Sequence, residues 1–269
     1  MVRWRVSYKV LSSLHVWFRG TGHSFGSAPL QKHRSLCASH FQKMTDYELE
    51  KWIWTEKDFR QMGWHDATIY GLRLTENLEL DIDYVLQWNQ PDIEGFQFTF
   101  WVAPTTLVFE RPTDLTFELT QSFDDKWLEI DDIEMEIVDC KNIWTIITQQ
   151  GDISFKADTF KQIIRKRPSF QLGQSIPYDE RGGFSFDLTP GDKLNGESRP
   201  DIVERRKKQF EGYELAKRKF GLKKELENLS ERCDSGQIQT KDFLIEKKEL
   251  KEKIDSLTFQ LRGTRYEEQ

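Results

Sequence analysis

Hydrophobic and polar residues alternate along residues 78–88. One parity is apolar throughout and the other is mostly acidic. Side chains alternate between the two faces of a β-strand, so this pattern predicts a strand that covers a core with one face and meets water with the other. A turn at residues 89–92 leads to a second alternating segment at residues 96–102, which predicts a β-hairpin. The apolar parity holds Leu78, Leu80, Ile82, Tyr84, Leu86 and Trp88, and the other holds Glu79, Asp81, Asp83, Val85 and Gln87.

Alternating segments continue as far as residue 188. Residues 128–137 change parity at Asp131-Asp132, which predicts an inserted residue, a β-bulge. The polar residues 149–152 separate two apolar segments and predict a hairpin turn. The remaining predicted strands cover residues 106–109, 115–119, 143–148, 153–156 and 184–188.

Three short segments carry the signature of a helix N-terminus instead. A hydroxyl residue three positions before an acid or amide is typical of a capping box, and this spacing occurs at Thr45, Thr55 and Thr159. The first two predict short helices ahead of the sheet, and the third predicts a helix that crosses the sheet and ends before Pro168. Together these elements predict an α+β fold, mainly an antiparallel β-sandwich or partly closed barrel with one short crossing helix.

Beyond residue 200 the hydrophobic period becomes helical. Apolar residues recur three or four positions apart on both sides of a break at residues 234–236, and Thr240 is a suitable N-cap for the second helix. This predicts a C-terminal antiparallel αα-hairpin over residues 201–265. The apolar stripe between two such helices is narrow and buries little area, so the hairpin should dock on the β domain or pair with another copy. The residues expected to support oligomerisation are Leu226, Leu229, Phe243, Leu250, Ile254 and Leu257.

The charge is distributed unevenly, although the net value is only −6. Residues 1–43 hold seven Lys/Arg and no acid, residues 44–199 hold 15 Lys/Arg against 30 Asp/Glu, and the rest is nearly balanced. Together with the change of period, this asymmetry predicts four regions. They are a basic leader at 1–43, an acidic antiparallel β domain at 44–188, a polar linker at 189–200 and the helical hairpin at 201–265.

The basic leader is interpreted as a disordered segment or a mis-assigned start, with Met44 as the functional first residue. It contains Gly22-His23-Ser24-Phe25-Gly26, a match to the GxSxG elbow of α/β-hydrolases. That elbow requires a strand before it, a helix after it and a catalytic His late in the chain. The chain has no His beyond His65, so the match is rejected.

The composition favours a soluble protein of a reducing compartment. No run of eighteen apolar residues occurs, so no membrane span is expected. The three cysteines are Cys37, Cys140 and Cys233, which are far apart and form no CxxC pair. An odd number of scattered cysteines is unlike a disulfide framework, which favours the cytoplasm.

Two parts of the chain resemble known families. Residues 225–254 resemble the SHOCT type of short C-terminal domain, through Gly236, Ile238, Phe243, Lys247 and Leu250. In this chain Gln239 stands between the aliphatic residue and Thr240, where the family has the Thr directly. The resemblance implies an oligomerisation or docking appendage without catalytic residues.

Residues 64–170 resemble a group of uncharacterised small bacterial β proteins that open with a Trp-His-Asp-Ala segment, some of them similar to immunity-type proteins that neutralise a cognate toxin. The similarity rests on the segments at 64–67, 81–84 and 100–104. It implies a β fold and offers no catalytic residues.

His65 is the only His outside residues 1–43. Its more common role is structural, in a turn; its alternative is a metal or acid–base site with strand carboxylates. The candidates for such a site are Asp81, Asp83, Glu118 and Glu129. No Walker loop, GxGxxG, HExxH or paired Cys/His spacing is present, so neither an enzyme nor a cofactor is predicted.

These observations favour a non-catalytic cytoplasmic binding protein. Its acidic β domain should repel nucleic acid and attract a basic protein partner. The sharper form of the hypothesis is an immunity-type inhibitor of a basic toxin. The alternatives are a metal-dependent enzyme that uses His65, and a purely structural oligomer that self-associates through the hairpin. The predicted binding residues are Trp64, His65, Asp66, Asp81 and Asp83.

Overall fold

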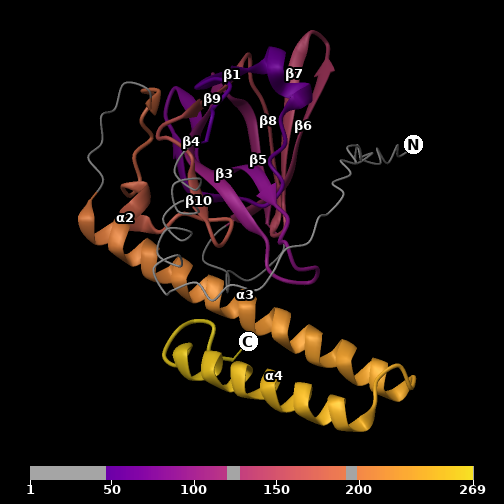
Figure 1. Cartoon of the computed structure of the whole chain (residues 1–269). Coiled ribbons are helices and arrows are strands. Elements are labelled where there is room, and N and C mark those ends of the chain that lie inside the picture. The colour runs from indigo at the N-terminus through magenta and orange to yellow at the C-terminus, as the bar shows by residue number, and fades with distance from the viewer. Residues whose placement is uncertain (1–46, 120–127, 192–198, 269) are drawn as a thin grey trace. The chain divides into compact units, whose positions relative to one another are not determined.

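An open, antiparallel sheet of ten strands forms the body of the protein, in the computed structural model, which describes residues 47–119, 128–191 and 199–268 (Figure 1). The strand order is β1-β9-β4-β3-β2-β6-β7-β8-β5, and β10 pairs with β4. With the C-terminal helical pair, this confirms the predicted α+β class. The strands are β1 (Ile53–Thr55), β2 (Ala67–Leu74), β3 (Asn77–Asn89), β4 (Thr99–Glu110), β5 (Thr113–Leu119), β6 (Leu128–Val138), β7 (Lys141–Thr148), β8 (Gly151–Lys156), β9 (Phe160–Ile164) and β10 (Ser169–Gln171).

One face of the sheet holds the main apolar core, to which strands of both halves contribute. The apolar parity of β3 lies there as predicted, since Leu78, Leu80 and Ile82 are fully buried. Aromatic rings fill the centre of this core. Their edge-to-face contacts stabilise it beyond the effect of the apolar area that the rings bury. The largest fully buried rings of this core are Trp64, Phe109, Trp144, Phe155 and Phe160.

The opposite face of β3 does not meet water, and that prediction is wrong. Glu79, Asp81 and Asp83 are all buried. Residues 172–191, which we call the covering segment, lie over this face and include the short helix α2 (Tyr178–Arg181). A strand covered on both sides can still alternate, provided that its buried polar groups find partners.

Two predicted elements adopt other structures. The expected crossing helix after Thr159 is strand β9, because its backbone pairs with β4 on one side and β1 on the other. A capping signal contributes only about 1 kcal/mol and is overridden by such pairing. The expected strand at 184–188 is irregular, because the N–H groups of Ser185 and Phe186 donate to the Asp81 carboxylate instead of to a strand.

Several local signals are confirmed. Thr55 and Asp58 form the predicted capping box at the start of the 3-10 helix η1 (Glu56–Gln61). The register of β6 shifts at Asp132, where a bulge was expected. A tight turn at residues 149–150 connects β7 to β8. The other predicted short helix does not form over residues 47–50, and its first residues, like the basic leader, lie outside the described residues.

Two long helices follow the sheet, α3 (Pro200–Asp234) and α4 (Thr240–Gln260), separated at the predicted break (Figure 1). α3 packs on the sheet domain through Tyr213 and Ala216, which join Phe96 in a second apolar cluster. Residues 43–269 accordingly form one compact unit. None of the helices within the described ranges is both long and apolar enough to span a membrane.

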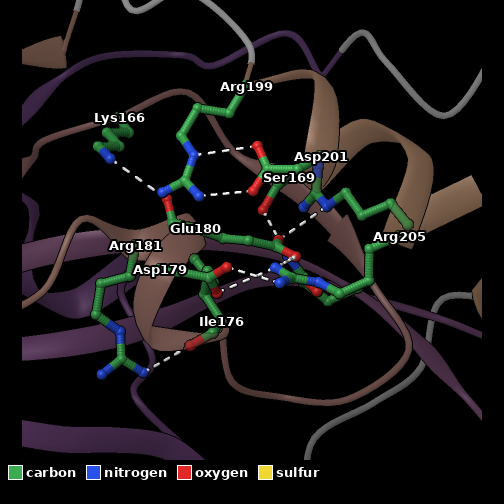
Figure 2. Close-up of polar contacts among 11 residues, drawn as sticks. Lys166, Ser169, Ile176, Asp179, Glu180, Arg181, Arg199, Asp201 and Arg205 are labelled. Carbon is green, nitrogen blue, oxygen red and sulfur yellow. Dashed lines mark hydrogen bonds and ion pairs between the residues drawn. The ribbon is translucent and has the colours of Figure 1, made fainter.

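Ion pairs attach the first turns of α3 to the covering segment. Figure 2 shows Arg205 of α3 facing Asp179 and Glu180 of α2. The nitrogen–oxygen distances of these two ion pairs are 2.6 and 2.9 Å. Arg206 donates to the second oxygen of Glu180 at 2.9 Å. The Glu180 side chain is nearly buried and accepts from both guanidinium groups, so α2 lies fixed between the sheet and α3.

Candidate binding site

Trp64, a predicted binding residue, belongs to the core. Its indole is 2% exposed and contacts the rings of Phe59 and Phe160. The indole N–H donates to Gln162 Oε1 at 2.8 Å, so its one polar atom is satisfied inside the protein. Trp64 therefore has no surface to offer a partner.

Asp81 and Asp83 are predicted binding residues that instead hold the covering segment. Asp81 accepts hydrogen bonds from Thr106 Oγ1 at 2.7 Å and from two backbone N–H groups of the covering segment at 3.0 Å. Asp83 accepts from the N–H of Ile176 at 2.9 Å and from Arg181 Nη2 at 2.5 Å. Carboxylates with this many donors are anchoring groups, and neither reaches the surface.

Tyr70 lies between the two buried guanidinium groups that balance these carboxylates. Arg181 stacks over its ring at 3.6 Å, and Arg165 donates to its hydroxyl. Burial raises the pKa of Tyr70, and burial also raises the pKa of Asp83 to about 6, because the loss of hydration outweighs the attraction of Arg181. The buried cluster is thus a closed structural network beneath the covering segment.

His65 and Asp66 lie in a turn just before β2, where the two side chains meet. Asp66 has a left-handed φ of 64°, and its N–H donates to the carbonyl of Ile130 at 2.9 Å. In an extended strand these neighbours would point to opposite faces. In the turn, His65 Nε2 lies 3.6 Å from Asp66 Oδ1, and Nδ1 lies 3.2 Å from Asp131 Oδ1. The structural role expected for His65 therefore has a physical basis in this turn.

Aromatic side chains extend this turn into a surface patch. The exposed ring of His65 stacks parallel to that of Trp88, with centroids 6.3 Å apart and an 8° angle between planes. Trp88 is 43% exposed and meets Phe98, itself 40% exposed, edge-on at 5.7 Å. We call His65, Asp66, Trp88, Phe98 and Asp131 the aromatic patch.

The residue pattern places Trp88 on the core parity of β3, so it does not predict that this ring is exposed. The register of β3 against β4 shifts between Val85 and Gln87. After the shift, Trp88 pairs with Phe100 and shares the face of Val85, opposite the core. A parity change inside an unbroken alternating run leaves no signal in the residue pattern, so only the pairing reveals it.

Asp66 connects the aromatic patch to the covering segment. Its second carboxylate oxygen accepts a hydrogen bond from Gln174 Nε2 at 2.7 Å. This contact leaves Asp66 largely buried, whereas Asp131 is 60% exposed. The covering segment therefore fixes the patch through Asp66, while Asp131 is exposed to solvent.

The carboxylates proposed for a metal site are not brought to His65. Asp81 and Asp83 lie under the covering segment, and Glu118 lies on β5, at the end of the strand order. Glu129 lies on β6, where its Oε1 accepts a hydrogen bond from Gln149 Nε2 at 2.6 Å. In the part of the chain that the structure describes, no three His, Cys, Asp or Glu side chains are arranged to hold a metal ion.

The residues expected to support oligomerisation pack within the helical pair. Leu229 and Leu250 are buried, and the other four are half-buried. The exposed apolar residues of α4 are different ones, such as Phe259 at 67%. Leu229 and Leu250 are thus covered within this chain, whereas the other four keep part of their surface exposed.

Neither a family model nor a curated protein sequence matches the chain. Among solved structures, it is similar to the crystal structure of an uncharacterized protein from Neisseria gonorrhoeae, at 14% identity and a TM-score of 0.24, over 36% of this chain and 90% of that one. A likeness at that level carries no argument, and the two family resemblances stay predictions.

Proposed function

We propose that this protein is a non-catalytic binding protein of the cytoplasm that recognises another polypeptide through the aromatic patch. The observation that carries the proposal is the exposed Trp88 ring stacked on His65. Tryptophan is enriched among the residues that dominate binding energy, because a rigid ring buries a large area at little cost in conformational entropy. Stacking on His65 and contact with Phe98 orient that ring before any partner arrives.

The partner should be basic. Besides the imidazole of His65, the ionisable side chains of the patch are the carboxylates of Asp66 and Asp131. An opposite charge on the partner would be attracted to them and oriented by them. The immunity-type form of the proposal, inhibition of a basic toxin domain, rests on these two acids, because Asp81 and Asp83 are buried.

The cytoplasmic part of the proposal is supported by the cysteines. Cys140 is exposed and Cys233 is half-buried, and within the described residues both are free thiols. Free exposed thiols are typical of a compartment in which thiols are kept reduced.

A photo-crosslinking experiment tests the proposed surface. p-Benzoylphenylalanine replaces Trp88 in the full chain, in its native cells, and a matched variant carries it at the exposed Phe259 of α4. We expect a polypeptide that crosslinks to position 88 and not to position 259. The purified polypeptide should then bind the unmodified chain.

The affinity of the purified partner for variants of the chain tests whether the aromatic patch is the binding surface. Trp88→Ala combined with Phe98→Ala should weaken binding of the purified partner by about 100-fold or more, whereas Phe259→Ala should leave it unchanged. Equal crosslinking at both positions, or a partner that tolerates the double substitution, would refute the aromatic patch as the binding surface.

A further inference from the structure

β6 has a free edge that starts at the aromatic patch. β2 pairs with β6 only over residues 128–130, while β7 pairs with it along nearly its whole length. The last contact on the β2 side is the hydrogen bond from the Asp66 N–H to the Ile130 carbonyl. Among the described residues, nothing pairs as a strand with the β2-side edge of residues 131–138.

The free edge is continuous with the proposed binding surface. Asp131 is the first residue beyond the β2 pairing, and its carboxylate lies 3.2 Å from His65. His65 in turn stacks on Trp88. A polypeptide that contacts the aromatic patch therefore lies where the unpaired backbone of β6 begins.

The two faces of this edge differ in chemistry. Asp132, Glu134 and Glu136 share the outer face and are exposed, and their cross-strand neighbours on β7 are uncharged. No Lys or Arg pairs with these three carboxylates within the described ranges. The opposite face carries Ile133, Met135 and Ile137, the last of which is 70% exposed.

We propose that an extended, basic segment of the partner adds to the free edge of β6 as a further strand. This inference rests on the proposed function, in which the aromatic patch anchors one end of the partner. Main-chain hydrogen bonds supply affinity in such strand addition, and alternate side chains supply specificity. The segment should alternate Lys or Arg, beside the three carboxylates, with apolar residues beside Met135 and Ile137.

A second copy of the chain fits this edge poorly. Antiparallel pairing of β6 with itself would bring Asp132, Glu134 and Glu136 of one copy next to those of the other. Like charges directly opposite one another destabilise a pair of strands, and charged edges are a common protection against such pairing. The same three carboxylates that exclude a copy attract a basic strand.

The test uses a synthetic nine-residue peptide of alternating Val and Lys with the full chain at millimolar peptide concentration. Hydrogen exchange should slow about tenfold at alternate amides of residues 131–138. Two further peptides carry N-methyl groups at the odd or at the even backbone positions. Since only one edge of the added strand faces β6, one N-methylated peptide should lose binding and the other should keep it. Equal binding by both, or no protection in β6, overturns the proposal.

Charge variants separate this inference from the proposed function. Glu134→Lys should weaken peptide binding about tenfold, whereas Glu118→Lys, the same change on exposed β5, should not. The crosslinked partner is tested in parallel. If Trp88→Ala with Phe98→Ala abolishes partner binding while Glu134→Lys leaves it unchanged, the aromatic patch stands and strand addition fails. If neither change affects the partner, both proposals fail.

Discussion

At the scale of single residues, identical residue types serve opposite purposes. Trp64 is closed into the core with its N–H bonded to Gln162, while Trp88 lies open on the surface. Asp81 and Asp83 are buried anchors, while Asp131 is an exposed acid of the aromatic patch. Residue type alone therefore says little about role in this protein, and substitutions at matched types test the assignment directly.

The two tryptophans should differ sharply in their effect on stability. Trp64→Ala leaves a cavity in the core and takes the donor away from Gln162 Oε1, so it should cost about 3–5 kcal/mol of unfolding free energy. Trp88→Ala should cost less than about 1 kcal/mol, because its ring is already half in water. Urea unfolding monitored by far-UV circular dichroism measures both values. A larger loss for Trp88→Ala would contradict the assignment.

Asp83 should make stability depend on pH. Burial places its folded-state pKa at about 6, above its ordinary value of 3.8, so between these values the folded state binds the proton more tightly. Its stabilising contribution is therefore complete below about pH 4 and lost as the pH rises through about 6, by at most about 3 kcal/mol. Urea unfolding from pH 4 to pH 7 should show wild type losing stability relative to Asp83→Asn.

A second carboxylate provides the control for this pH profile. Hydrogen bonding to Lys51 holds the pKa of Asp58 below its ordinary value. Relative to Asp58→Asn, wild type should therefore gain stability as the pH rises from acid, which is the opposite sign. A profile for Asp83→Asn that is parallel to wild type would exclude a raised pKa at Asp83.

At the scale of elements, the covering segment is the piece on which the rest depends. Within the segment, Arg181 of α2 donates to the carbonyl of Ile176. From α3, Arg205 and Arg206 form ion pairs with the acidic residues of α2. The backbone N–H groups of the covering segment donate hydrogen bonds to the buried carboxylates of β3. Sheet and helical pair are thus connected through a segment that has little regular structure of its own.

Glu180→Ala should loosen the start of α3. The change removes the nearly buried acceptor of two guanidinium groups, so amide exchange should accelerate at residues 200–206 and remain slow near Leu229. Glu204→Ala is the matched control, because its exposed pair with Lys208 contributes little. Uniform acceleration along α3, or none, would show that these ion pairs do not hold its first turns.

At the scale of the whole molecule, the helical pair and the sheet share apolar surface. Phe96, from the turn between β3 and β4, packs with Tyr213 of α3 and with Tyr266 near the C-terminus. Tyr213 also donates to the carbonyl of Gln97 at 3.1 Å. The helices are thus part of the folded unit, and their seam is a source of its stability.

Leu229→Ala should therefore destabilise the protein without changing its mass in solution. The buried side chain lies within the helical pair, so truncation should cost about 2–4 kcal/mol. Light scattering after size-exclusion chromatography should give the same mass for wild type, Leu229→Ala and the exposed control Phe259→Ala. A fall in mass for Leu229→Ala alone would support the purely structural oligomer instead.

The amino-acid sequence by itself determined several features that depend only on neighbouring residues. The capping box at Thr55, the bulge at Asp131-Asp132, the turn at residues 149–150 and the helix break before Gln237 all formed as expected. Each depends on backbone preferences within a few residues, which the residue pattern records. The apolar parity of β3 up to Tyr84 was predictable for the same reason.

Only the tertiary structure decided what covers the other face of β3, where Arg181 reaches Asp83 from 98 residues away. A carboxylate that is buried against distant donors and a carboxylate that is solvated give the same alternating pattern. Alternation shows that the two faces of a strand differ, but it does not show whether the polar face is covered by another segment. The strand at Phe160–Ile164 and the outward turn of Trp88 were decided likewise, by pairing with β4. The aromatic patch exists because those long-range pairings bring His65, Trp88 and Asp131 together.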